Sequence, residues 1–276
     1  MINNIFAVYF SPTGNTAKIV KDVATTVGAE LGHPIKVIDY TLPQNRNHHL
    51  NFQKEDLVIW GTPVYAGRIP NKLLPYVRSG AIGNGALAVP IAVFGNRNYD
   101  DCLFELRNEL ERNNFHTIAG AAFVSAHVFS DKIGAGRPDA ADSEEMQRFA
   151  KKLAEKIKRM TNIPKPVEIS KRDVVGSYYT PLGVDGKPAV FLKAKPETDV
   201  VKCQKCGLCV AVCPMGSISK ENPLNVTGIC IKCQACIMVC PNNAKYMDDP
   251  EFLSHKAMLE KNYTDRAANK IFYGEL

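Results

Sequence analysis

The sequence has no hydrophobic run long enough to cross a membrane. The longest apolar run, Ala86 to Phe94, has nine residues and contains Pro90, whereas a membrane-spanning helix needs about 20. The N-terminus also lacks a basic segment followed by a long apolar region, which a secretory signal would show. We therefore expect a protein without a membrane span, located in the cytoplasm.

Clusters of Lys and Arg with interleaved aromatic residues are also missing. The formal net charge of +6 divides evenly, with +3 in residues 1–160 and +3 in residues 161–276. A mild and even excess is unlike the electrostatic footprint of a protein that binds nucleic acid. It is able to attract an acidic partner, although an ordinary solvated surface explains it as well.

A disulfide scaffold is the third feature that the sequence lacks. Eight of the nine cysteines fall in two runs, CQKCGLCVAVCP and CIKCQACIMVCP, and the second run begins 27 residues after the first. Each run has the form C-x2-C-x2-C-x3-C-P, which is ligand spacing and favours a reducing compartment. We expect the ninth cysteine, Cys102, to be a small buried hydrophobic residue.

Both runs have the bacterial-type spacing that binds cubane 4Fe–4S clusters. Three thiolates spaced by two residues can each bind one iron of the same cubane. The fourth cysteine of the run, a helical turn further on, ligates the other cluster. The predicted ligand sets are Cys203, Cys206 and Cys209 with Cys240, and Cys230, Cys233 and Cys236 with Cys213. The alternative is two zinc sites, although zinc motifs usually set paired C-x2-C hooks apart.

The N-terminal segment predicts an anion-binding turn. Residues Ile5 to Phe10 resemble a buried parallel strand, and Ala17 to Leu31 has the apolar spacing of a helix. Between them, Ser11-Pro12-Thr13-Gly14-Asn15-Thr16 offers three hydroxyls and a helix N-terminus to a phosphate. Because the turn has neither a Walker Lys nor G-x-G-x-x-G, neither ATP nor a dinucleotide is favoured. An ordinary capped helix is the alternative, although it would explain only one hydroxyl.

Four more strands are expected downstream, alternating with helices. The strands are Ile35–Tyr40, Leu57–Trp60, Ala86–Phe94 and Phe115–Val124. The helices are Asn71–Arg78, a segment that ends near Asn113, and Asp142–Met160. Such alternation implies a parallel sheet with helices on both faces. His127 follows the fifth strand, at the edge where ligands usually bind, and we expect it to have a structural role.

With these motifs, residues 1–160 resemble a flavodoxin, and residues 200–247 resemble a two-cluster bacterial ferredoxin. The order of the two parts is similar to that in the flavodoxin–ferredoxin fusion proteins of anaerobic bacteria and archaea. The resemblance implies an α/β fold, a flavodoxin-like doubly wound five-stranded parallel sheet of order 2-1-3-4-5, plus a small α+β bacterial ferredoxin-like domain. It implies FMN and two 4Fe–4S clusters as cofactors.

The resemblance also implies which residues bind FMN. The phosphate would be held by Ser11, Thr13, Gly14, Asn15 and Thr16. Two loops would flank the ring system, and their predicted binding residues are Pro63, Val64, Tyr65, Ala66, Gly67, Gly95, Asn96, Tyr99 and Asp100. Tyr65 and Tyr99 would stack on the flavin, unless they are ordinary surface tyrosines, and Asn96 would bond its polar edge.

Two arginines in these loops predict an effect on redox potential. Arg68 and Arg97 stand beside only two acidic residues, Asp100 and Asp101. A cation near the ring would stabilise the negative charge added on reduction, and so would raise the potential of the flavin. The alternative is that both side chains extend into water.

The remaining segments are a connector and a tail. Residues 161–199 are expected to form an ordered connector, with a hairpin around Gly183–Gly186, that packs between the domains. Residues 248–276 would contain a helix at about Glu251–Asn262, followed by an apolar docking strip at Ile271-Phe272-Tyr273.

These observations support an electron relay between FMN and the two clusters. An FMN-dependent reductase of a small molecule, fed with electrons by the clusters, is the alternative. A third hypothesis has structural clusters and no flavin, but the intact phosphate turn argues against it. The expected partner is a redox protein, acidic if the positive charge steers it, and a homodimer is compatible with the sequence.

Overall fold

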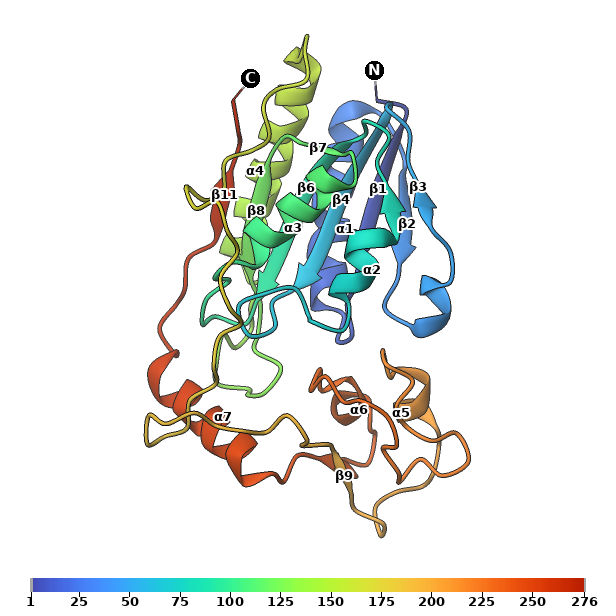
Figure 1. The fold of residues 1–276 in the computed structure, drawn as a ribbon, viewed down its shortest axis with the longest axis vertical. Helices are drawn as coiled ribbons and strands as arrows, with labels where there is room; N and C mark the ends of the chain where they lie inside the picture. The colour runs from blue at the N-terminus through green and yellow to red at the C-terminus, as the bar shows by residue number, and fades with distance from the viewer. Residues whose placement is uncertain (1, 276) are drawn as a thin grey trace.

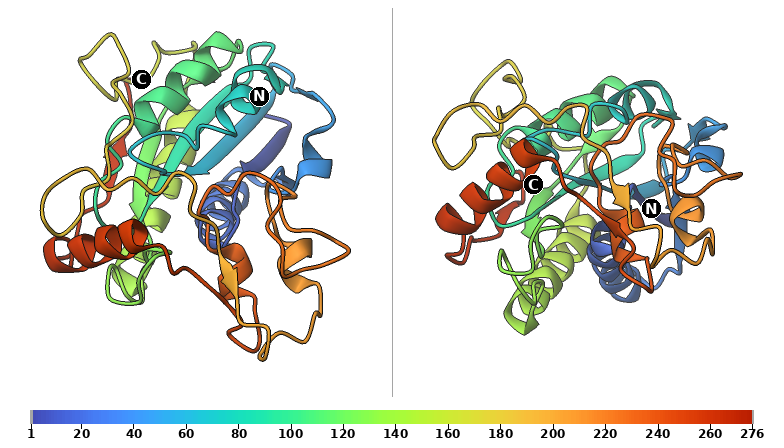
Figure 2. Two further views of the ribbon diagram at one scale, coloured as in Figure 1. Left: turned by 60° about the horizontal axis from the view of Figure 1, so that its bottom comes forward. Right: turned by 90° about the horizontal axis from the view of Figure 1, so that it is seen from below.

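The computed structural model describes residues 2–275. Two residues of the predicted segments lie outside the described residues: Met1, the first residue of segment 1–160, and Leu276, the last residue of segment 248–276. Figure 1 shows an α/β domain above a smaller cysteine-containing domain, and Figure 2 shows the same arrangement from below.

A parallel β-sheet forms the centre of the first domain. Its strands are β1 (Asn4–Tyr9), β2 (Ile35–Asp39), β4 (Asp56–Pro63), β6 (Leu87–Phe94) and β8 (Gly120–Val124). They are parallel and lie in the order β2-β1-β4-β6-β8, which confirms the predicted order 2-1-3-4-5. The carboxyl ends of all five strands therefore lie at one edge of the sheet, the lower edge in Figure 1.

The sheet has an edge strand that the prediction lacked. Strand β11 (Lys270–Phe272), from the C-terminal tail, pairs with β8 in the antiparallel direction. The predicted fifth strand is also interrupted, since β7 (His116–Thr117) and β8 pair separately with β6. Without the tail, the outer backbone groups of β8 would lack partners in the sheet. The tail strip predicted from Ile271 onwards thus docks on β8.

Helices cover both faces of the sheet. Strand residues alternate between two hydrophobic cores because successive side chains point to opposite faces: Leu57 and Ile59 lie in one, Val58 and Trp60 in the other. Helices α1 (Asn15–Leu31) and α4 (Ala140–Arg159) cover the first core. Helices α2 (Leu74–Ser79) and α3 (Cys102–Arg112) cover the second, where Cys102 is fully buried, as expected.

The cysteine-containing domain lies beneath the carboxyl edge of the sheet (Figure 1). Two short helices, α5 (Leu208–Ala211) and α6 (Ala235–Met238), follow equivalent positions in the two cysteine runs. A short antiparallel pair, β9 (Glu197–Thr198) and β10 (Lys245–Tyr246), joins the ends of the domain. Helix α7 (Pro250–Asn262) then leads the chain back to β11.

The connector runs along the first domain before it enters the second. The backbone N–H of Tyr179 donates to the carbonyl of Ala66 at 2.8 Å, and the Tyr178 hydroxyl donates to the carbonyl of Ile69 at 2.8 Å. The predicted hairpin is a single antiparallel bridge between Leu182 and Pro188. Among residues 2–275, none of the helices combines the length and apolar character needed to cross a membrane.

Three small elements complete the first domain. Strands β3 (Leu50–Asn51) and β5 (Ala81–Ile82) pair in parallel apart from the main sheet. The 3-10 helix η1 (Pro43–Arg46) follows β2 and reaches the cysteine-containing domain, because the Arg46 guanidinium donates to the carbonyl of Pro214 at 2.5 Å.

Candidate functional site

The turn after β1 forms one wall of a cavity at the carboxyl edge of the sheet. Gly14 has a φ of 88°, which favours glycine, and α1 begins at the next residue. The Ser11 hydroxyl accepts a hydrogen bond from the N–H of Ala17 at 2.9 Å, so Ser11 holds the turn closed. The first N–H groups of α1 have no partner within the helix, and they are the groups that an anion binds.

This sheet-edge cavity has a volume of about 220 Å³. Of the predicted FMN-binding residues, those that line it are Thr13, Asn15, Thr16, Pro63, Val64, Tyr65, Ala66, Gly67 and Gly95. They come from the loops after β1, β4 and β6, which the parallel sheet brings to one edge. Thr16 is buried, and its methyl group lies close to Gly61, where an added Cβ would come within 3.1 Å of it.

The other predicted FMN-binding residues do not line the cavity. Ser11 and Gly14 shape the turn instead. The Tyr99 ring packs against Phe94, with ring centroids 5.7 Å apart. Asp100 pairs with Arg97 and lies against Gly67, where a side chain would collide with its carboxylate.

Asn96 uses its amide to hold the C-terminal tail. Its Nδ2 donates to the carbonyls of Tyr263 and Asp265, both at 2.8 Å, and its Oδ1 accepts from the N–H of Ala267 at 3.1 Å. Asn96 has a φ of 64° and its side chain is buried. The loop after β6 is therefore positioned by a segment almost 170 residues away in the sequence.

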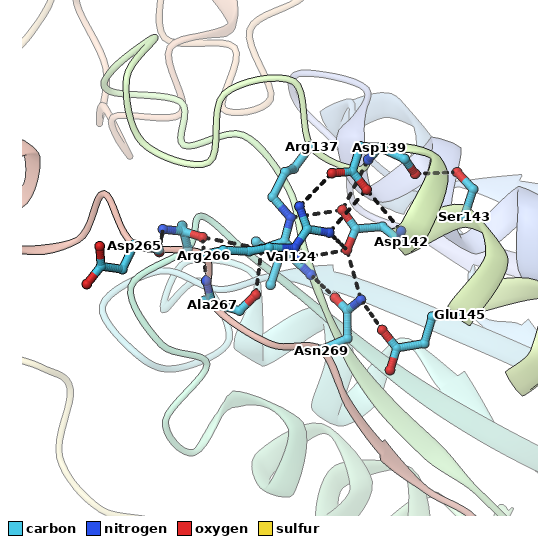
Figure 3. A network of polar contacts seen from close by, with 11 residues as sticks. Val124, Arg137, Asp139, Asp142, Ser143, Glu145, Asp265, Arg266, Ala267 and Asn269 are labelled. Carbon is cyan, nitrogen blue, oxygen red and sulfur yellow. Dashed lines mark hydrogen bonds and ion pairs between the residues drawn. The ribbon is translucent and has the colours of Figure 1, made fainter.

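A buried polar network extends this attachment (Figure 3). Arg137 donates to both carboxylate oxygens of Asp142, at 2.8 and 2.5 Å. Asn269 donates to Asp142 at 3.0 Å and accepts from the N–H of Val124 at 2.8 Å. Burial raises the pKa of Asp142, but the hydrogen bonds from Arg137 and its other partners outweigh burial and hold the pKa below its ordinary value. The network thus fixes the tail to the end of β8 and the start of α4.

Several residues of the cavity carried no sequence signal as ligand-binding residues. They are Ser125, Ala126, Val128 and Phe129 after β8; Tyr179, Pro181 and Phe191 of the connector; Ile231 and Lys232; and His255 and Leu259 of α7. His127, expected to be structural, also lines the cavity. These segments are far apart in the sequence, so only the tertiary structure could bring them together.

Two further cavities in the cysteine-containing domain are lined by cysteines. The proximal set is Cys213, Cys230, Cys233 and Cys236. The distal set is Cys203, Cys206, Cys209 and Cys240. Each set contains the same four cysteines as one predicted ligand set. Cys209 of the distal set and Cys236 of the proximal set belong to one small hydrophobic cluster with Ile218, so the two sets are in contact through it.

The backbone wraps around both cavities in the same way. The residues on either side of the second cysteine of each run have positive φ: Lys205 and Gly207 around Cys206, and Lys232 and Gln234 around Cys233. Backbone N–H groups donate to sulfur in both sets, from Ser217 to Cys213 at 3.3 Å and from Ala244 to Cys240 at 3.2 Å. N–H groups aimed at sulfur stabilise negatively charged thiolates, so the residues fit an iron–sulfur cluster.

Burial makes free thiolates unfavourable in the proximal set. It raises the pKa of Cys233 and of Cys236 to about 12, so these thiolates require a compensating positive charge such as iron supplies. Within residues 2–275, no three His, Cys, Asp or Glu side chains converge as they would around a single metal ion. The cysteines of each set surround a cavity instead.

The proximal set lies directly beside the sheet-edge cavity. Ile231 and Lys232 line both the sheet-edge cavity and the cavity of the proximal set. Burial raises the pKa of Tyr65 well above its ordinary value, and the nearby Cys233 and Cys230 add to this effect. The cavity of the distal set shares no lining residue with the sheet-edge cavity.

Comparisons with known proteins find matches to each of the two parts of the chain. Residues 196–219 match the family model of the 4Fe-4S binding domain. A comparison with curated protein sequences finds no match.

Solved structures of flavodoxins are similar to the first part. One from the domain Archaea is 13% identical over 57% of this chain and 100% of that chain, with a TM-score of 0.38. The flavodoxin of Streptococcus pneumonia TIGR4 is 19% identical over 56% and 99%, with a TM-score of 0.40. Flavodoxin 2 from Bacillus cereus is 16% identical over 56% and 99%, with a TM-score of 0.41. The fold class itself rests on the strand order of the sheet. The chain joins a flavodoxin-like α/β domain to a 4Fe–4S binding domain.

Proposed function

We propose that the chain is an intramolecular electron relay, in which FMN in the sheet-edge cavity exchanges electrons with two 4Fe–4S clusters. One cluster is held by the proximal cysteine set and the other by the distal set. The observation that carries the proposal is the wall that Ile231 and Lys232 share between the sheet-edge cavity and the proximal set. With a flavin on one side of this wall and a cluster on the other, electrons would pass between them without leaving the protein.

The residues of the first domain have distinct roles in this proposal. When bound, FMN supplies one-electron and two-electron chemistry, and each 4Fe–4S cluster supplies one-electron transfer. The turn from Thr13 to Thr16 binds the phosphate through hydroxyl and N–H groups. Segments of the connector and α7 also line the cavity, through Tyr179 and Leu259 among others, and in this proposal they shield the bound flavin from water.

The distal set provides the route to the outside. Cys206 is exposed, and so is Val201, which is 92% exposed. Lys202 and Lys205 are also exposed in the same loop. An acidic redox protein would be attracted to this edge and would exchange electrons with the distal cluster first. The route then runs through the proximal cluster to the flavin.

The alternative is a reductase of a small molecule that the clusters supply with electrons. Such an enzyme needs room for a substrate beside the flavin. The lining of the sheet-edge cavity includes residues of the connector, of α7 and of the loop at Ile231, so a substrate would have to share a covered space with FMN. This cover favours the relay, which needs no second ligand.

Anaerobic purification followed by cofactor and rate measurements tests the relay. We expect one FMN and two clusters per chain, or about eight irons from the cubane stoichiometry. After mixing with a limiting reductant, the clusters should pass electrons to the flavin at a rate that does not depend on protein concentration. Zinc in place of half the iron, or a rate proportional to protein concentration, would contradict the proposal.

A further inference from the structure

Two histidines from distant parts of the chain line the sheet-edge cavity. His127 follows β8, and His255 belongs to α7. Each ring is held by an aromatic neighbour: Phe129 packs edge-on against His127 with centroids 5.0 Å apart, and Phe191 stacks on His255 at 5.5 Å. Neither imidazole is therefore free to reorient without disturbing its neighbour.

The hydrogen bond at Nδ1 fixes the tautomer of His127. Its Nδ1 accepts from the backbone N–H of Phe129 at 3.1 Å, so Nδ1 carries no proton. The ring proton of the neutral imidazole is therefore on Nε2. Burial, with smaller effects from His255 and Arg97, lowers the pKa of His127 to about 4, so the ring is neutral near pH 7.

The hydrogen bond of His255 fixes the opposite tautomer. Its Nδ1 lies 2.8 Å from the carbonyl oxygen of Leu182, which can only accept, so Nδ1 carries the proton. Burial lowers the pKa of His255 as well, and the neutral ring then has a lone pair on Nε2. Within residues 2–275, the Nε2 atoms of both rings lack a hydrogen-bond partner.

The two histidine rings thus contribute one N–H donor and one lone-pair acceptor to the lining of the cavity. The other charged groups that line it are less available: Arg97 is paired with Asp100 and lies over the Tyr179 ring, and Lys232 donates to the carbonyls of Leu192 and Cys230. A ligand edge that uses both histidines would present a carbonyl oxygen to His127 and an N–H group to His255. The imide edge of a flavin ring has this pattern, and its dimethylbenzene edge has neither group.

We propose that His127 and His255 recognise the pyrimidine edge of the flavin, with Nε2–H of His127 donating to a ring carbonyl and Nε2 of His255 accepting the ring N3–H. The inference rests on the proposed function, because it requires a flavin in the cavity. It assigns the orientation of the ring: the imide edge faces the loop after β8 and α7. Gly95 makes room for the His127 ring in this position, because a Cβ there would lie 2.5 Å from that ring.

Binding of two flavins to four forms of the full-length chain tests the proposal. The flavins are FMN and N3-methyl-FMN, which lacks the N3–H. The proteins are the wild type, His127→Phe, His255→Phe and His49→Gln, a control at an exposed histidine of the first domain. Dissociation constants come from quenching of flavin fluorescence after removal of the native flavin, and iron content shows that each variant retains its clusters.

In the wild type and the control, N3-methylation should weaken binding about tenfold, as expected for a lost hydrogen bond. In His255→Phe this penalty should fall to about twofold or less, because the acceptor is already gone. His127→Phe should bind FMN about threefold to tenfold more weakly and keep the full methylation penalty. An equal penalty in the wild type and His255→Phe would overturn the inference. Failure of the wild type to bind FMN at all would instead overturn the proposed function.

Discussion

At the scale of single residues, the two threonines of the phosphate turn have hydroxyls that can be removed without changing the shape of the turn. Thr13 and Thr16 both line the sheet-edge cavity. Valine keeps the methyl group that Thr16 places near Gly61. The pair of substitutions Thr13→Val and Thr16→Val therefore isolates the effect of the hydroxyls on flavin binding.

We expect the Thr13→Val, Thr16→Val protein to bind FMN at least tenfold more weakly than the wild type. Each hydrogen bond to a charged phosphate contributes about 1.5–3 kcal/mol. Fluorescence titration gives the dissociation constant, and iron content should stay at the wild-type value because the clusters lie in the other domain. Stoichiometric flavin at low micromolar protein would show that this turn does not bind the phosphate.

The two arginines predicted to raise the flavin potential differ in position. Arg68 donates to the Glu105 carboxylate at 2.8 and 2.5 Å, stacks on Tyr178 and does not line the cavity. Arg97 lines the cavity, although its ion pair with Asp100 offsets part of its charge. The sequence could not separate them, because each follows a strand in a polar loop.

Replacement of Arg97 by Gln should lower the potential of the bound flavin by about 40 mV. This shift corresponds to roughly 1 kcal/mol for one electron, after the partial screening by Asp100. Arg68→Gln is the matched control: it should leave the potential unchanged but destabilise the fold, because the buried carboxylate of Glu105 loses its partner. Redox titration of the bound flavin measures both, and equal shifts in the two variants would contradict the assignment.

At the scale of elements, the tail from α7 to β11 holds the loop after β6 in place. Asn96 connects the loop after β6 to the backbone of this tail through three short contacts. A glycine at this position would remove the amide and accept the positive φ, whereas an alanine would also introduce backbone strain. Comparison of the two variants separates the lost hydrogen bonds from the strain.

We expect Asn96→Gly to lower the free energy of unfolding of the first domain by about 2–3 kcal/mol and to weaken FMN binding. The loss reflects the unsatisfied carbonyls and N–H group of the tail, and Asn96→Ala should cost about 1 kcal/mol more. Urea unfolding can be followed by the fluorescence of the single tryptophan, Trp60, which is fully buried in the first domain. Unchanged stability in both variants would mean that the tail does not brace this loop.

At the scale of the whole molecule, a small contact with η1 joins the cysteine-containing domain to the first domain. Arg46 donates to the carbonyl of Pro214, the residue after Cys213. Met215 and Ile231 pack at the edge of the hydrophobic core beneath α2 and α3. These contacts hold the proximal set against the sheet-edge cavity, so they should matter for electron transfer more than for cofactor content.

Arg46→Met should slow electron transfer between the clusters and the flavin severalfold, because the loop after Cys213 loses its anchor. The counts of FMN and iron should not change. Arg112→Met is the control, since Arg112 lies on α3 and its side chain is 67% exposed. Stopped-flow measurement of flavin reduction reports the rate, and identical rates in Arg46→Met and Arg112→Met would show that this contact does not hold the redox groups together.

Local patterns allowed the sequence by itself to predict the five parallel strands and the main helices of the first domain. The strand order followed from the resemblance that the turn after β1 and the alternating strands supported, and the topology confirms it. Three cysteines of each set followed from spacings of two residues, which a single short loop and helix can satisfy, and residues this close in the chain meet in nearly the same way whatever surrounds them. The fourth, Cys240 or Cys213, belongs to the other run, and its assignment followed from the known ligand pattern of the doubled motif.

Only the tertiary structure decided how the site is assembled. It placed Tyr99 and Asn96 away from the sheet-edge cavity, brought His127 together with His255, and set Ile231 between that cavity and the proximal cysteines. It also paired β11 with β8, about 150 residues apart. The reason is physical: contacts between segments more than 100 residues apart depend on how whole elements pack, and no spacing within one element records that packing.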